Sequence, residues 1–85
     1  MAYAVEITRP AARQLASLPR DIQQQIRRRI DGLAENPRPP QSKLLHGGDR
    51  IHRLRSGDYR ALYVVDDDKR LVTIISVGHR KDIYR

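Results

Sequence analysis

The amino-acid sequence predicts a single small α+β domain, with a two-helix hairpin packed on one face of a mainly antiparallel sheet. Three observations lead to this fold class: a strand-like opening segment, two stretches with helical spacing of apolar residues, and three strand-like runs that form a C-terminal meander. The chain has 85 residues, enough for one hydrophobic core, so we expect one domain over residues 1–85. Helices on one face leave the other face of the sheet open.

The first part of the chain is predicted to hold a strand and both helices. Apolar and polar residues alternate over residues 3–8, as in a strand. Thr8 is a candidate N-cap of the first helix, and Pro10 falls in its first turn, where the missing N–H costs nothing. Pro19 breaks this helix, and a second begins beside it, with Asp21 at the positive end of its dipole. The apolar stripe of the second helix comprises Ile22, Ile26, Ile30 and Leu33.

The middle of the chain has the composition of a connector. The second helix is expected to end at Asn36-Pro37, and residues 37–49 hold three prolines and two glycines. We interpret them as an ordered connector rather than a domain boundary. Within it, Lys43-Leu44-Leu45 is expected to dock its apolar pair onto the core.

The last part of the chain predicts a three-stranded meander over residues 50–56, 58–66 and 70–77. Ser56-Gly57-Asp58 forms the first hairpin turn, and residues 66–69 form the second. Residues 71–77 are almost continuously apolar and β-branched. That pattern is typical of a central strand covered on both faces.

The charge of the chain favours an anionic partner. The formal net charge is +7 and the isoelectric point is near 10.6, so nucleic acid is the first candidate. There is no cysteine, which excludes disulfides and thiolate metal sites. The acidic run Asp66-Asp67-Asp68 suits a hairpin tip better than an ion, so we predict no metal and no cofactor. No apolar run can cross a bilayer, and the start shows no export signal, so we expect a cytoplasmic protein without membrane contact.

Strand periodicity places arginines on the open face of the sheet. If Leu54 points at the helices, Arg53 and Arg55 point away from them, and Arg60 on the next strand does the same. An arginine fixed on a strand suits phosphate binding in one geometry. Each alone can equally be an ordinary solvent-facing cation. Several together favour a functional role, because like charges opposite each other on a sheet repel.

Further candidates lie outside that face. Arg80, Lys81 and Tyr84 follow the last strand, and Tyr84 can pack on the core, stack on a base or exchange a proton. His79 is a further candidate, because histidine is the kind of side chain that can exchange a proton near neutral pH. The run Arg27-Arg28-Arg29 fits the solvated side of the second helix and can also make nonspecific phosphate contacts.

Two motifs, read with the first helix, give a resemblance to a known family. Residues 54–63 read LRSGDYRALY, residues 75–84 read ISVGHRKDIY, and residues 11–19 read AARQLASLP. Over nearly its whole length the chain resembles the RelE/ParE superfamily of bacterial and archaeal toxins. The RelE branch fits better, because it keeps basic residues and a C-terminal tyrosine at these places.

The resemblance implies a toxin of a type II toxin–antitoxin system, a ribosome-dependent endoribonuclease that cuts mRNA in the A site. It also implies a RelB-like antitoxin as inhibitor, with operator DNA contacted only through the toxin–antitoxin complex. By position, Arg60 and Arg80 match the family's active-site arginines, Arg53 a basic strand residue, and Tyr84 the C-terminal tyrosine. Ile51 and His79 stand where some members carry lysine.

These residues suggest a metal-independent cleavage by the RNA's own 2′-hydroxyl. We assign phosphate stabilisation to Arg60 and Arg80, and a lowered potential around the site to Arg53. Cations near a phenol lower its pKa, so Tyr84 is the candidate base or a stacking platform, and His79 or Arg80 the candidate acid. The remaining candidate RNA-binding residues are Arg55, His79, Lys81, Arg27 and Arg28.

Two other functions remain open at this point. A ParE-like inhibitor of DNA gyrase would share the fold and leave mRNA intact. A noncatalytic nucleic-acid-binding module would lose RNA affinity on substitution of Arg60 and cleave nothing.

Overall fold

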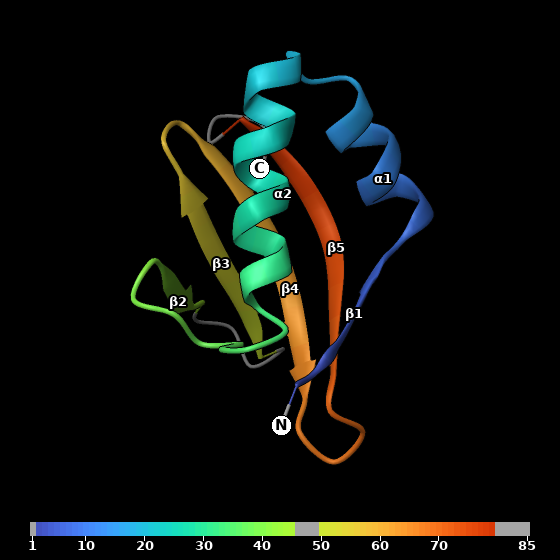
Figure 1. The fold of residues 1–85 in the computed structure, drawn as a ribbon, viewed down its shortest axis with the longest axis vertical. Helices are drawn as coiled ribbons and strands as arrows, with labels where there is room; N and C mark the ends of the chain where they lie inside the picture. The colour runs from blue at the N-terminus through green and yellow to red at the C-terminus, as the bar shows by residue number, and fades with distance from the viewer. Residues whose placement is uncertain (1, 46–49, 80–85) are drawn as a thin grey trace.

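The computed structural model describes residues 2–45 and 50–79, which form two helices and a five-stranded sheet of order β1-β5-β4-β3-β2 (Figure 1). The strand β1 pairs in parallel with β5, and all other neighbours are antiparallel. The α+β class and the meander β3-β4-β5 are therefore confirmed. The elements run β1 (Ala4–Ile7), α1 (Arg9–Ala16), α2 (Arg20–Gly32), β2 (Ser42–Leu44), β3 (Ile51–Ser56), β4 (Tyr59–Asp66) and β5 (Leu71–His79).

The start of α1 follows from local chemistry. The Thr8 side chain accepts a hydrogen bond from the Ala11 amide at 3.3 Å, which confirms the predicted N-cap. Further along α1, Gln14 reaches the edge of β5, where its Oε1 accepts from the Val77 amide at 2.8 Å. Because β1 stops at Ile7, this part of β5 has no strand neighbour on that side among the described residues. The Gln14 side chain takes the place of a neighbouring strand by accepting this hydrogen bond.

Both helices lie on one face of the sheet and bury their apolar stripes there (Figure 1). The helix α2 ends at Gly32, earlier than the predicted Asn36-Pro37, and a turn follows it. Ile26, Ile30 and Leu33 of the predicted stripe are at most 2% exposed. The buried core comprises Ala11, Leu15, Ile26, Ile30, Leu33, Leu54, Ala61, Tyr63, Val72, Ile74 and Val77.

The connector prediction for residues 37–49 is wrong in one respect, because it contains the edge strand β2. Lys43 pairs with Arg53, and Leu44 with His52, in antiparallel register. Leu44 is 54% exposed, so it does not dock onto the core as expected. A three-residue strand is too short to show an alternating pattern.

The prediction that residues 71–77 are covered on both faces is also wrong. The strand β5 is interior, between β1 and β4, but the helices cover only one of its faces. A register shift opposite Leu62/Tyr63 leaves Ile75 without a partner on β4. This irregularity turns Val77 to the core side after Val72 and Ile74. The apolar run is therefore continuous for two reasons. The alternation of inward-facing and outward-facing side chains shifts by one residue at the irregularity, and the open face of β5 is itself half-buried.

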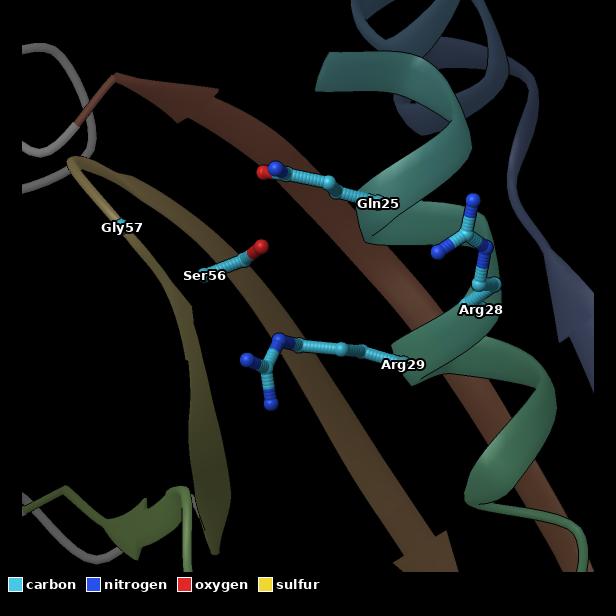
Figure 2. Close-up of a pocket in the computed structure, with 5 residues that line it drawn as sticks. All are labelled: Gln25, Arg28, Arg29, Ser56 and Gly57. Atoms are coloured by element: carbon cyan, nitrogen blue, oxygen red, sulfur yellow. The ribbon is translucent and has the colours of Figure 1, made fainter. Parts of the chain in front are cut away.

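The turn between β3 and β4 depends on a glycine. Gly57 has φ +61, in the left-handed region, which a residue with a Cβ adopts only at a cost. Figure 2 shows Gly57 at this turn, across from α2. A Cβ there would meet no atom within 4 Å. Backbone conformation alone therefore requires glycine.

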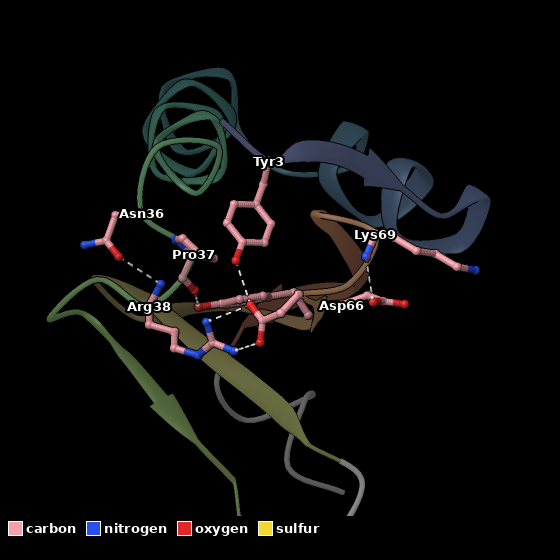
Figure 3. Close-up of polar contacts among 8 residues, drawn as sticks. Tyr3, Asn36, Pro37, Arg38, Asp66 and Lys69 are labelled. Carbon is pink, nitrogen blue, oxygen red and sulfur yellow. Dashed lines mark hydrogen bonds and ion pairs between the residues drawn. The ribbon is translucent and has the colours of Figure 1, made fainter. Parts of the chain in front are cut away.

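The centre of the sheet is organised around Tyr63, which is fully buried. Its hydroxyl donates to the Pro37 carbonyl at 2.7 Å (Figure 3), and its ring stacks on His52 at 5.1 Å between centroids. Burial raises the pKa of Tyr63, so the hydroxyl remains a donor. Burial also lowers the pKa of His52, and Arg38 acts in the same direction while Arg50 and Asp67 oppose it.

At the other end of the sheet from Gly57, a polar cluster joins three separate segments (Figure 3). The Tyr3 hydroxyl donates to Asp67 at 2.6 Å, and both terminal nitrogens of Arg38 donate to the same carboxylate, the shorter contact at 2.9 Å. These bonds hold the pKa of Asp67 below its usual range. The cluster is exposed, so we expect it to orient the segments more than to stabilise them.

Two glycine substitutions should have opposite effects. Gly57→Ala should lower the free energy of unfolding by about 1 kcal/mol, because alanine is strained at positive φ. Gly32→Ala should raise it by roughly 0.5 kcal/mol, since Gly32 ends α2 without positive φ and its Cβ site is open. Urea unfolding of both variants measures the difference. Equal shifts in both variants would contradict this account of the turn.

His52 should make the fold sensitive to mild acid. Its pKa is lowered in the folded state, so the unfolded chain binds a proton more readily once the pH falls below about 6.5. The free energy of unfolding should be highest above that pH and should decline as the pH falls below it. His52→Phe keeps a ring against Tyr63 and cannot titrate, so its unfolding free energy should change less between pH 7.5 and 5.5. If the two proteins lose stability equally over this interval, His52 is not the group responsible.

Candidate functional site

The open face of the sheet carries a row of cations at the β2–β3–β4 side. In register, Lys43 lies opposite Arg53, and Arg55 lies opposite Arg60. Leu54, between the two β3 arginines, is buried under the helices. The predicted facing of Arg53 and Arg55 therefore agrees with the strand geometry. An open hollow of about 370 Å³ adjoins the row and is bordered by Lys43, Arg53, Arg55 and residues 40–42.

Arg60 differs from an ordinary strand cation, because it is only 7% exposed. Its Nη1 donates to the carbonyls of Gly57 and Tyr59, both at 3.1 Å. The interpretation of Arg60 as a solvent-facing cation is therefore wrong. The Gly57 and Tyr59 carbonyls hold its guanidinium in place.

The cation row ends at Arg60, beside the last residues of β5. Gly78 is the β5 partner of Arg60, and His79 is the partner of Tyr59. Having no side chain, Gly78 contributes no bulk beside Arg60 on the open face. The next residues along the chain include the candidates Arg80, Lys81 and Tyr84, which lie outside the described residues.

His79 is not brought together with the cation row. Its ring makes an edge contact with Tyr59 at 5.4 Å between centroids. Both side chains border a hollow of about 440 Å³ with Gln14 and the α1–α2 turn, on the helix side of the sheet. The cation row lies on the opposite face.

The arginines of α2 also lie away from the row. Arg27, Arg28 and Arg29 are all exposed, as expected for the solvated side of the helix. Arg28 and Arg29 border hollows between α2 and the sheet edge, and Arg27 does not line them. The two candidate residues Arg27 and Arg28 therefore differ in position. Arg29, the third member of the predicted run, lines both hollows together with Arg28.

Lys43 is the member of the row that the sequence did not reveal. The connector interpretation hides it, because a cation in a loop has no defined facing. Only the pairing of β2 with β3 places Lys43 opposite Arg53. The one available signal in the sequence is the polar Ser-Lys pair just before two leucines.

The described residues contain neither a group of metal-ligating side chains nor a membrane-spanning helix. Within residues 2–45 and 50–79, no three His, Asp or Glu side chains gather as metal ligands would. Neither helix in the described part of the chain has the length and apolar character needed to span a bilayer.

Comparisons with known proteins agree on one family. The model of the family described as the ParE toxin of the type II toxin–antitoxin system, parDE, matches residues 5–84. Toxin RelE of Mycobacterium tuberculosis is 37% identical, covering 98% of this chain and 87% of that protein. The mRNA interferase toxin RelE of Escherichia coli K12 is 33% identical, covering 95% of this chain and 86% of its own length.

A solved structure extends the likeness to three dimensions. The toxin–antitoxin complex RelBE2 of Mycobacterium tuberculosis contains a chain that superposes with a TM-score of 0.83 at 33% identity. The match covers 94% of this chain and all of that chain. The similarity therefore includes the sheet that carries the cation row.

Replacing Lys43 should weaken RNA binding. Lys43→Ala removes one cation that faces Arg53, so affinity for a single-stranded RNA should fall, and the slope of log affinity against log salt should decrease by roughly 0.7. Lys69→Ala, in the β4–β5 turn away from the row, is the matched control. Fluorescence anisotropy over a range of salt concentrations measures both. Equal losses in the two variants would mean that only net charge matters.

Proposed function

This chain belongs to the RelE/ParE family of type II toxins, and on that premise we propose that it cleaves mRNA in the ribosomal A site. The cleavage uses the RNA's own 2′-hydroxyl, requires no metal ion and takes place in the cytoplasm. A cognate RelB-like antitoxin inhibits the toxin, and operator DNA is reached only through their complex.

The cation row on the open face is the observation that carries this proposal. Lys43, Arg53, Arg55 and Arg60 share that face across three neighbouring strands. The helices cover the opposite face, so the row is not part of the core. A single RNA strand crossing β2, β3 and β4 would present phosphates to successive members of the row.

Arg60 is suited to stabilise charge that develops during cleavage. As the 2′-oxygen attacks phosphorus, it loses a proton, the bond from phosphorus to the 5′-oxygen breaks, and that oxygen gains a proton. Negative charge builds on the non-bridging oxygens in between. A guanidinium already fixed by the Gly57 and Tyr59 carbonyls needs little reorganisation to meet that charge.

The proton transfers are assigned to residues that follow β5. In this proposal Tyr84 takes the proton of the 2′-hydroxyl or stacks on the base, and Arg80 adds to the stabilisation of the phosphate. The contact of His79 with Tyr59 on the helix side favours Arg80 over His79 as the proton donor. Such a set lacks an ordinary acid–base pair, which is a physical reason for the reaction to need a substrate held by the ribosome.

The antitoxin and the RelE assignment have separate support. The similar structure from Mycobacterium tuberculosis is a toxin–antitoxin complex, and the Escherichia coli relative is an mRNA interferase. The matching family model is described by its ParE member, so gyrase inhibition is the alternative to be tested beside RNA cleavage.

Cleavage in growing cells tests the proposal. Induction of the chain should give codon-phased breaks in a translated message, read by primer extension, and Arg60→Ala should reduce them at least about 100-fold. Arg60→Lys keeps the charge without the fork and should retain an intermediate rate. Tyr84→Phe should slow cleavage if the phenol transfers a proton, and leave it unchanged if the ring only stacks.

Exposed Arg9 of α1 provides the control, since Arg9→Ala should cut like the unmodified chain. Intact message together with inhibited gyrase supercoiling would replace the RelE function with the ParE function. Unaltered cuts in Arg60→Ala would remove Arg60 from the mechanism.

A further inference from the structure

A second cationic groove lies between α2 and the β3–β4 turn, on the helix side of the sheet. It is open, has a volume of about 500 Å³, and is lined by Gln25, Arg28, Arg29, Ser56 and Gly57. Figure 2 shows Gln25 and Arg29 extending from α2 towards β3, with the Ser56 hydroxyl directed back towards the helix. The cation row of the open face contributes no residue to this groove.

Helix geometry explains the groove. Gln25, Arg28 and Arg29 stand at positions i, i+3 and i+4, so they share one stripe of α2. The core stripe with Ile26 and Ile30 lies beside it and fixes the helix on the sheet. The burial of the apolar stripe therefore sets the position of the polar one.

Both guanidinium groups are available to a ligand. Within residues 2–45 and 50–79, neither Arg28 nor Arg29 has a carboxylate or other hydrogen-bond partner. Two positive charges at neighbouring positions repel each other, and an anion between them would relieve that repulsion. Across the groove, Gly57 has no side chain, and the space above its Cα is open, so a ligand can approach the backbone closely.

The chemistry of the lining favours phosphate over a protein segment. Arginine forks bind phosphate oxygens in pairs, and the Gln25 amide and the Ser56 hydroxyl can donate to the remaining oxygens. A partner protein usually places apolar or aromatic anchors in the pockets it fills. This groove offers no apolar side chain to receive one. The neighbouring hollow bordered by Pro39 and Leu54 is the place where such an anchor would fit.

Resting on the function proposed above, we infer that the groove binds the phosphodiester backbone of ribosomal RNA, not the message that is cut. The groove and the cation row lie on opposite faces of the sheet, so one RNA strand held for cleavage does not occupy both. A protein seated in an RNA-lined cavity meets phosphates on more than one side. Arg28 and Arg29 therefore position the toxin on the ribosome, and the row holds the message.

Binding to purified 70S ribosomes tests this division of labour. The variant Arg28→Gln/Arg29→Gln should bind message-free ribosomes at least about tenfold more weakly. The slope of log affinity against log salt should become shallower by roughly 1.5, for two lost phosphate contacts. Cosedimentation at several salt concentrations gives both quantities. A second arm uses ribosomes carrying a message with a 2′-deoxy codon in the A site, which cannot be cleaved through a 2′-hydroxyl.

The matched control is Arg9→Gln/Arg20→Gln, which removes the same amount of charge. Both residues are exposed in the first turn of a helix, where a cation is not required. This variant should lose at most about threefold in ribosome affinity. Glutamine is a good helix former in all four places, and circular dichroism verifies that every variant is folded.

Each other outcome overturns the inference in a recognisable way. Equal losses in the two double variants would mean that net charge alone acts. A loss seen only with message present would assign the groove to mRNA. Unchanged ribosome binding with lost antitoxin binding would make the groove a protein interface. If the unmodified chain fails to bind ribosomes at all, the proposed RelE function itself is wrong.

Discussion

The hydrogen bond from Tyr63 to the Pro37 carbonyl is the constraint on which the arrangement of the functional face depends. Tyr63 is fully buried, and the bond joins the middle of β4 to the segment that follows α2. An unpaired buried hydroxyl would cost roughly 1–3 kcal/mol, so the connector is held against the sheet. That position brings β2 beside β3 and Lys43 opposite Arg53. A buried contact thereby determines the spacing of charges on the surface.

The two faces of the sheet have different roles: one stabilises the fold, and the other carries the candidate functional residues. On one face, the helices bury the apolar side chains of β3, β4 and β5 in a continuous core. On the other, cations stand where like charges repel, a cost that the core must offset. Arg60 reduces this cost locally, because its guanidinium donates to two backbone carbonyls. On the helix side, α1 and α2 carry their charged residues away from the buried stripes.

Features that follow from a local repeat along the chain can be predicted from the sequence. Features that depend on pairing between distant segments cannot. The Thr8 cap, the Ile26–Ile30 stripe and the facing of Arg53 follow from local periods and are confirmed. The strand β2 is too short to have a period and exists through its pairing with β3. The burial of Arg60 depends on carbonyls at a turn, which no alternation pattern encodes. The groove that Arg28 and Arg29 form with Ser56 and Gly57 depends on where α2 lies against the sheet.

The contact between Gln14 and β5 affects whether copies of the chain associate at high protein concentration. A strand with unused amide and carbonyl groups is a template on which another molecule can add its own strand. Gln14 occupies the Val77 amide at the stretch of β5 that β1 leaves bare. The Gln14 side chain from α1 thus hinders another molecule from adding a strand to the sheet at this edge. The edge strand β2 is protected differently, because it is only three residues long and carries the charged Lys43.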